Sequence, residues 1–172
     1  KPSSAASDVY KRQIRNGGTM AWWLVKSEPH VYGIEDLRRE GTTLWSGVRN
    51  YQARNYLRAM RVGEELFFYH SVANPAGIAG VARVVSVAEA DPTQFDPASE
   101  YFDPKATYNA PRWFCPRVEF VRAFDFVLAR RDLLERSDLA GLELLKPRSR
   151  LSVQPVSKEH FERLYALAVG DI

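Results

Sequence analysis

The chain is organised around residues 44–57, LWSGVRNYQARNYL. Asn50 is one of the residue types that cap helices, and apolar residues follow it at helical spacing as far as Met60. We therefore expect a helix that begins after Asn50 and ends at Gly63. Before the cap, an aromatic ring, a serine and a glycine precede Arg49, and the glycine lets the backbone approach a neighbouring group closely.

The composition is that of a single globular domain. Of 172 residues, 45% are hydrophobic and 26% are charged, which is the ordinary balance of a folded protein in water. No apolar run reaches the roughly 18–20 residues that a membrane helix needs, so we expect no membrane partner. The single cysteine, Cys115, excludes an internal disulfide and a multi-cysteine zinc site, and we expect its thiol to be buried and inert.

The first 19 residues differ from the remainder of the chain. They hold four basic residues and one acid, and so account for the whole formal net charge of +3. They are polar and aperiodic, and Met20 follows them. We interpret residues 1–19 as a non-native or disordered leader and residues 20–172 as one domain.

Apolar runs and helical spacing predict the elements of that domain. The expected strands are residues 21–26, 65–70, 78–87, 113–124 and 149–153, and the expected helices are residues 34–40, 50–63, 129–136 and the segment capped by Ser157. Residues 90–112 form a long loop with three Asp-Pro turns, and its aromatic residues predict that it packs down. We expect an α+β fold: a mixed, mostly antiparallel sheet curled into an open barrel with flanking helices.

The chain shows no signature of a catalytic or metal centre. It contains no G-x-S-x-G elbow and no P-loop, and residues 77–80 lack the full dinucleotide-binding fingerprint. The three histidines lie far apart without the spacing of metal ligands. We therefore expect a binding protein that uses no metal and no cofactor. An enzyme with His70 as general base is the alternative.

Basic residues are concentrated in three windows that hold no acid, at residues 41–63, 104–118 and 144–158. One such window would be unremarkable, but these three also contain most of the clusters of polar and aromatic residues. They predict a basic face that meets phosphates, and a chance arrangement of solvated loops is the alternative.

Side chains in these windows have the properties that a nucleobase site requires. Trp45 and Trp113 offer flat rings for stacking, and Asn50 and Gln154 offer amides that can read the edge of a base. Each has a simpler explanation when taken alone, because tryptophans are commonly core residues and Asn50 can be only a helix cap. Together they predict an aromatic pocket with arginines beside it.

Five motifs, in order along the chain, resemble the EVE domain family. They are residues 23–29 (WLVKSEP), 45–55 (WSGVRNYQARN), 68–71 (FYHS), 111–113 (PRW) and 150–156 (RLSVQPV). The match runs from Ala21 to about Ala168. This resemblance implies a PUA-like fold, related to the YTH and ASCH domains, and a role in recognising modified bases in DNA or RNA. The YTH comparison also implies an aromatic cage around the modified base.

The motif positions imply which residues form the site. The base-binding pocket carried over from the family comprises Trp45, Ser46, Gly47, Val48, Asn50, Tyr69, His70, Ser71, Trp113, Ser152 and Gln154. The expected phosphate-binding residues are Arg49, Arg54, Arg148 and Arg150. Within this pocket we expect Tyr69, His70 and Ser71 to form the floor, the tryptophans to stack, and Asn50, Ser71 and Gln154 to bond the base edge.

The sequence thus predicts a non-catalytic reader of a modified base, with a modified cytosine as the first expectation and DNA or RNA as the partner. A binder of another small flat ligand, or a protein-interaction module, is the alternative. The leader does not resemble the long basic extension of eukaryotic family members, which favours the compact bacterial form. We accordingly expect a cytoplasmic location in a bacterium, or a nuclear one if the source is eukaryotic.

Overall fold

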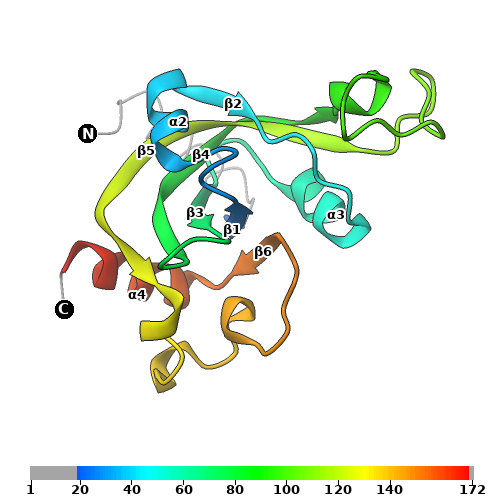
Figure 1. The fold of residues 1–172 in the computed structure, drawn as a ribbon. Coiled ribbons are helices and arrows are strands. Elements are labelled where there is room, and N and C mark those ends of the chain that lie inside the picture. The colour runs from blue at the N-terminus through cyan, green and yellow to red at the C-terminus, as the bar shows by residue number, and fades with distance from the viewer. Residues whose placement is uncertain (1–18, 171–172) are drawn as a thin grey trace.

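The computed structural model describes residues 19–170 as an open, curled sheet with helices packed around it (Figure 1). The six strands run in the order β2-β5-β4-β3-β1-β6. They are β1 (Trp22–Ser27), β2 (Thr42–Leu44), β3 (Glu65–His70), β4 (Gly77–Ala90), β5 (Phe114–Ala129) and β6 (Val153–Val156). The helices are α2 (Ile34–Glu40), α3 (Tyr51–Ala59) and α4 (Lys158–Val169). The expected leader, residues 1–19, lies outside the described residues apart from Thr19.

Strand pairing confirms the expected mixed, mostly antiparallel sheet. β1 pairs parallel with β3, so that Ser27 lies beside His70 at the carboxyl ends of the two strands. The remaining pairs, including that of the short edge strand β2, are antiparallel. The register between β4 and β5 shifts at four places, and such bulges bend and twist a long strand pair. The sheet therefore curls, but it stays open between its edge strands β2 and β6.

Alternate residues of the strands face two hydrophobic clusters, one on each side of the sheet. Trp23 and Val25 of β1 belong to the first cluster, which also holds the buried residues of α2 and α3. Leu24, between them, belongs to the second cluster, which includes α4. In that second cluster, Phe67 of β3 stacks on Phe161 of α4 with 4.0 Å between the ring centroids. The two sides of the sheet are thus separate environments.

The helices begin where their capping residues predict. Asn50 caps α3, because its Oδ1 accepts a hydrogen bond of 2.9 Å from the Ala53 N–H. Ser157 caps α4 in the same way. The prediction that the helix capped by Asn50 continues to Gly63 is wrong, since α3 ends at Ala59 and Met60 is already extended and buried.

The boundaries of several other elements also differ from the prediction. β5 continues to Ala129 because it stays paired with β4 over this length. The helix expected at residues 129–136 begins instead as a 3-10 turn, Arg130–Asp132. The last strand is β6 rather than residues 149–153, because pairing with β1 begins at Val153. The prediction lacks β2, whose three residues carry too short a pattern of alternation.

The described residues contain neither a reactive thiol nor a cluster of metal ligands. Cys115 is buried, and burial raises the pKa of its thiol to about 12, so that the thiol is protonated at neutral pH. Between residues 19 and 170, no three histidine, cysteine, aspartate or glutamate side chains are placed to hold a metal ion together. Over the same range, no helix has the length and apolar character required to cross a membrane.

A buried carboxylate joins the start of β1 to the turn after α3. Glu64 is 1% exposed. Its Oε1 accepts hydrogen bonds from the Trp23 indole N–H at 3.0 Å and from the Arg61 backbone N–H at 2.8 Å. Its Oε2 accepts from the Ala21 N–H at 2.8 Å. Three donors from two distant segments therefore depend on one side chain, and a buried donor that loses its acceptor is costly.

We predict that Glu64→Ala lowers the free energy of unfolding by about 2–4 kcal/mol, because three N–H groups lose their acceptor. Urea denaturation would show this as a lower midpoint at an unchanged m-value. Glu162→Ala is the matched control, since the Glu162 side chain is 65% exposed on α4. Equal midpoints for wild type and Glu64→Ala would show that water replaces the carboxylate.

Candidate functional site

Three chain segments meet where the parallel strands β1 and β3 end. The loop after β3 is held by a hydrogen bond of 2.9 Å from the Ser71 N–H to the Ser27 carbonyl. The segment before β6 is held by a bond of 2.9 Å from the Lys26 N–H to the Ser152 carbonyl. The turn after β1 is closed by the Ser27 hydroxyl, which donates to the Tyr32 carbonyl at 2.6 Å. We call residues 27–32, 71–76 and 148–152 the carboxyl edge.

Three aromatic rings pack together beside the carboxyl edge. The ring of Trp45 lies 5.3 Å from that of Phe68 and 6.5 Å from that of Tyr32, and both contacts are edge-to-face. Tyr32 in turn lies 6.4 Å from Phe68. Trp45 is 7% exposed, so protein already covers most of its ring, whereas Tyr32 is partly exposed. These rings form an apolar wall in which Tyr32 is the most accessible member.

Gly47 brings the segment before α3 into contact with the long loop. Its φ of 86° is one that residues with a side chain rarely adopt. A Cβ at this position would lie 3.0 Å from the ring of Tyr101, so the close approach also requires glycine. Burial and the carboxylates of Glu100 and Glu28 raise the pKa of the Tyr101 phenol. The carboxylate of Glu28, on the carboxyl edge, is therefore within electrostatic range of the Tyr101 phenol.

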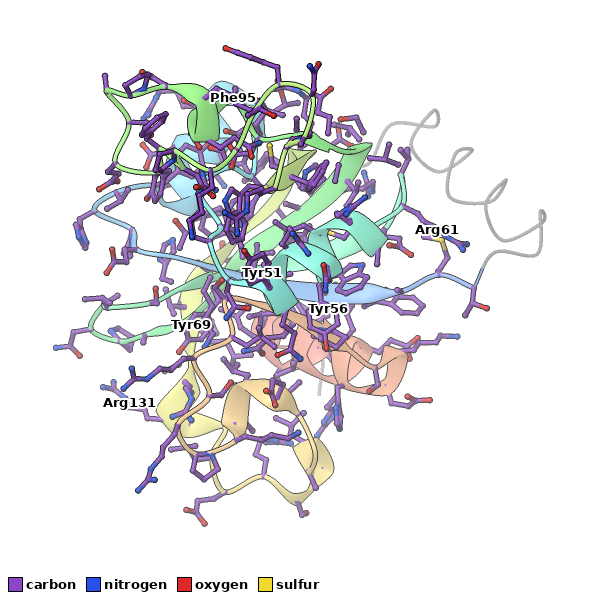
Figure 2. The ribbon with its side chains drawn as sticks, turned by 90° about the vertical axis from the view of Figure 1, so that its right-hand side faces the viewer. Tyr51, Tyr56, Arg61, Tyr69, Phe95 and Arg131 are labelled. Carbon is purple, nitrogen blue, oxygen red and sulfur yellow. The ribbon has the colours of Figure 1, made fainter. Side chains whose placement is uncertain are left out.

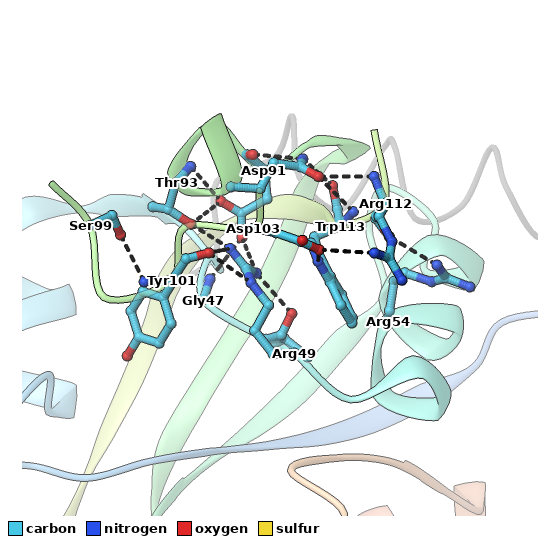
Figure 3. Close-up of polar contacts among 12 residues, drawn as sticks. Gly47, Arg49, Arg54, Asp91, Thr93, Ser99, Tyr101, Asp103, Arg112 and Trp113 are labelled. Carbon is cyan, nitrogen blue, oxygen red and sulfur yellow. Dashed lines mark hydrogen bonds and ion pairs between the residues drawn. The ribbon is translucent and has the colours of Figure 1, made fainter. Parts of the chain in front are cut away.

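Arg49 fastens the loop to this segment (Figure 3). Its guanidinium donates to the Tyr101 carbonyl at 2.7 and 3.0 Å, to Thr93 Oγ1 at 2.9 Å and to the Val48 carbonyl at 3.0 Å. It also pairs with Asp91, whose Oδ2 lies 3.2 Å away and whose side chain is 1% exposed. Every guanidinium nitrogen is therefore engaged within the chain. We call the contacts of Arg49 with Asp91 and Tyr101 the loop latch.

A second buried polar group holds both ends of the long loop. Gln94 is fully buried, and its amide nitrogen donates to the carbonyls of Asp91 and Trp113 at 2.8 Å. Its Oε1 accepts from the backbone N–H groups of Arg112 at 2.9 Å and of Trp113 at 3.0 Å. The amide thus uses both of its donors and both of its acceptor positions. The hydrogen bonds of this one side chain therefore hold together the point where the loop leaves the sheet and the point where it returns.

Trp113 lies at the end of the loop, in contact with α3. Its indole N–H donates to Asp103 Oδ2 at 2.7 Å, and this bond is the main cause that lowers the pKa of Asp103. Tyr51 stacks on the Trp113 ring at 4.9 Å with an angle of 24° between the planes. Trp113 is only 5% exposed. A base could stack on this ring only if Tyr51 moved away.

Strand geometry divides the expected floor of the pocket between the two sides of the sheet. Tyr69 belongs to the second hydrophobic cluster, whereas the next residue, His70, packs against Phe68 of the first at 5.6 Å. Gln154 is fully buried, and its register with β1 places it on the side of Tyr69. Trp45 belongs to the first cluster. The structure therefore brings Trp45 and His70 together but places Tyr69 and Gln154 on the opposite side.

His70 has a structural role at the start of α2. Its Nε2 accepts a hydrogen bond of 3.1 Å from the Ile34 backbone N–H, so the ring is neutral with its proton on Nδ1. Burial lowers the pKa of this histidine. The lone pair that a general base would use is therefore already engaged, which weakens the enzyme alternative.

The remaining expected residues differ in accessibility. Ser46 is exposed, and Val48, Ser71 and Ser152 are half-buried. Among the expected phosphate-binding residues, Arg148 and Arg150 are exposed at the carboxyl edge. Arg54 is half-buried, donates to the Arg112 carbonyl at 2.9 Å and lies 4.8 Å from the centre of the Tyr51 ring. These three arginines are better placed than Arg49 to meet a phosphate.

A cavity of about 510 Å³ lies between α3, β6 and the start of α4. Its lining includes Gln52 and Tyr56 of α3, Leu151 and His160. None of the expected pocket residues lines it, so it is separate from the aromatic wall.

The EVE domain family model matches residues 21–167. The chain belongs to the EVE domain family. Human thymocyte nuclear protein 1 is 40% identical over 163 residues, which cover 84% of this chain and 72% of that protein.

Solved structures share the fold of this EVE domain. The structure of a Pseudomonas putida protein is 49% identical with a TM-score of 0.84, and the match covers 86% of this chain and 99% of that one. The structure of human THYN1 protein in complex with DNA containing 5-methylcytosine is 39% identical with a TM-score of 0.77. That match covers 86% of this chain and 97% of the THYN1 chain. The PUA-like fold that the motifs imply is therefore confirmed.

The candidate site of this EVE domain and the contacts that hold it include residues that the sequence patterns did not single out as site residues. Asp91 and Gln94 resemble ordinary loop residues, because nothing local shows that they contact positions far along the chain. Glu28 stands inside the WLVKSEP motif, which could have drawn attention to it. Tyr101 stands among the aromatic residues of the long loop, where the contact with Gly47 is visible only in three dimensions.

We predict that Arg49→Lys loosens the loop while the sheet stays folded, because an ammonium cannot reproduce the forked contacts of a guanidinium. Hydrogen–deuterium exchange of residues 91–113 should rise, and the free energy of unfolding should fall by about 2 kcal/mol. Arg58→Lys is the control, since Arg58 is exposed and lies over the Phe114 ring at 4.2 Å. Unchanged exchange in Arg49→Lys would show that the loop does not depend on the latch.

We predict that His70 makes the folded state less stable at acid pH. Its folded pKa lies below the ordinary value of 6.5, so the unfolded chain binds the proton first as the pH falls. His70→Gln keeps an acceptor for the Ile34 N–H but cannot titrate. Urea denaturation between about pH 7.5 and pH 5 should show wild type losing stability relative to this variant. Parallel stability curves for the two proteins would contradict the assignment.

Proposed function

We propose that this EVE domain binds a modified base, foremost a modified cytosine, in a nucleic acid, and that it does so without catalysis. The observation that carries the proposal is the similarity to human THYN1 protein, whose structure contains DNA with 5-methylcytosine. The two chains match over nearly the whole domain at 39% identity, so the same region of the fold is present in both.

The chemistry between the aromatic wall and the loop supports this proposal. Tyr32 and Trp45 form the apolar side, and Tyr101 supplies a second aromatic ring, 36% exposed, across Gly47. Base–aromatic stacking contributes about 1–3 kcal/mol per base. The Glu28 carboxylate acts electrostatically on the Tyr101 phenol, and a carboxylate is a suitable acceptor for the exocyclic amine of cytosine. We therefore assign the base to the space bordered by these residues.

The sugar–phosphate backbone would meet cations that flank this space. Arg148 and Arg150 stand at the carboxyl edge, and Arg54 stands at the start of α3. Three neutralised phosphates predict a slope of about −3 for the logarithm of the binding constant against the logarithm of the salt concentration. So few phosphate contacts leave a large share of the affinity to the contacts with the base.

We predict that Tyr101→Ala and Glu28→Gln each weaken binding to an oligonucleotide containing 5-methylcytosine by about tenfold, because they remove a stacking ring and a charged acceptor. Fluorescence polarisation measures this with matched oligonucleotides that carry cytosine, 5-methylcytosine, 5-hydroxymethylcytosine or N6-methyladenine. Tyr108→Ala is the control, since Tyr108 belongs to the same loop but is 81% exposed and stacks on Phe95.

Selective binding that Tyr101→Ala weakens by about tenfold and Tyr108→Ala preserves would support the site. Equal, weak binding of all the oligonucleotides by wild type would contradict the proposal and favour another flat ligand or a protein partner. Mass spectrometry of the recovered oligonucleotides provides the test of non-catalysis, because any change in the mass of the base would show turnover.

A further inference from the structure

Val72, at the carboxyl edge, has a backbone conformation that its own side chain disfavours. Its φ of 49° lies in the left-handed region, which β-branched residues avoid. The residue is also 72% exposed. A single exposed apolar residue is ordinary, but this one combines exposure with backbone strain. Such strain persists only where the surrounding structure imposes it, and it gathers at sites that contact ligands.

The loop that carries Val72 is held at both ends. The Ser71 N–H bonds the Ser27 carbonyl at 2.9 Å, and the Arg130 N–H bonds the Ala76 carbonyl at 2.9 Å. The first bond ties the loop to β1, and the second ties it to the end of β5. Val72 therefore projects from a loop whose two ends are fixed to the sheet.

The segments next to this loop carry basic side chains. Arg131 is exposed and follows Arg130, and Figure 2 shows it beyond Tyr69 on the same side of the molecule. Lys26 lies close enough to Arg130 for that cation to contribute, after burial, to lowering the pKa of Lys26. Residues 148–152 add Arg148 and Arg150 to the same edge of the sheet.

The charges of this edge remain available to a partner. Within residues 19–170, Arg131, Arg148 and Arg150 form no ion pair with an acid. The neighbouring Glu143 is paired with Lys146 at 3.2 Å. An exposed apolar side chain among free cations suits a partner that combines flat apolar surfaces with phosphates.

We propose that Val72 is an apolar wedge that enters the base stack of a duplex beside the base held in the site, while the surrounding cations hold the phosphates. The proposal rests on the function proposed above and commits the partner to double-stranded nucleic acid. A base leaves a duplex only at the cost of its stacking, and a side chain that fills the space left behind reduces that cost. A single strand offers no such space, so there the wedge contributes nothing.

The test compares Val72→Asn with wild type on a duplex with one 5-methylcytosine and on the same strand alone. Asparagine accepts the left-handed conformation, so the variant should fold at least as stably, but it removes the apolar tip. Duplex affinity should fall on the order of tenfold, while single-strand affinity stays within about twofold. Val87→Asn is the matched control, because Val87 is 58% exposed at the other end of β4. Repeating the comparison with a DNA duplex and with an RNA duplex shows which of the two nucleic acids is the partner.

A second readout reports the wedge directly. A 2-aminopurine placed next to the 5-methylcytosine should become brighter when wild type unstacks it, and Val72→Asn should abolish this gain. Equal losses on duplex and single strand, or no loss on either, would overturn the wedge and leave the proposed function standing. If wild type distinguishes 5-methylcytosine in neither form, the proposed function fails and the wedge fails with it. Val72→Gly, which also relieves the strain, should behave as Val72→Asn does.

Discussion

The ion pair between the buried carboxylate of Asp91 and the part-buried guanidinium of Arg49 is the contact on which the proposed site depends. The two residues are 42 positions apart along the chain, and their contact joins the segment before α3 to the long loop. A buried carboxylate such as that of Asp91 is costly unless it is paired, so the loss of Arg49 would leave an unpaired buried charge. Arg49 also donates to the Tyr101 carbonyl. The need to pair the Asp91 carboxylate therefore also helps to position the Tyr101 ring.

Local signals were sufficient for much of the fold. Asn50 and Ser157 predict helix starts, because a capping side chain acts within three residues of its own position. The apolar runs of β1 and β3 likewise predict buried strands. Their parallel pairing could not be predicted, since register depends on partners far along the chain. The stop of α3 at Ala59 depends on the burial of Met60, which is also a tertiary effect.

The candidate site was predicted less completely than the fold. The family motifs indicate a region of the fold, but they do not say which side of the sheet each residue faces. Tyr69 and His70 are neighbours in a strand, so the alternation of strand side chains alone separates them. The Asp-Pro pair predicts that Asp91 forms a turn, and its Oδ1 does accept a hydrogen bond of 2.8 Å from the Thr93 N–H. Its second oxygen carries the long-range role that local sequence cannot show.

The four hydrogen bonds of the Gln94 amide have an evolutionary consequence. Because one amide fixes the departure and return of the loop, the residues between its ends contribute little to positioning the sheet. The entropy of closing a loop grows only slowly with its length, so insertions and deletions there should be well tolerated. We therefore expect relatives of this domain to vary most in the parts of this segment that hold neither Tyr101 nor Asp103. Ligand preference can then diverge while the core sequence stays under the constraints of packing.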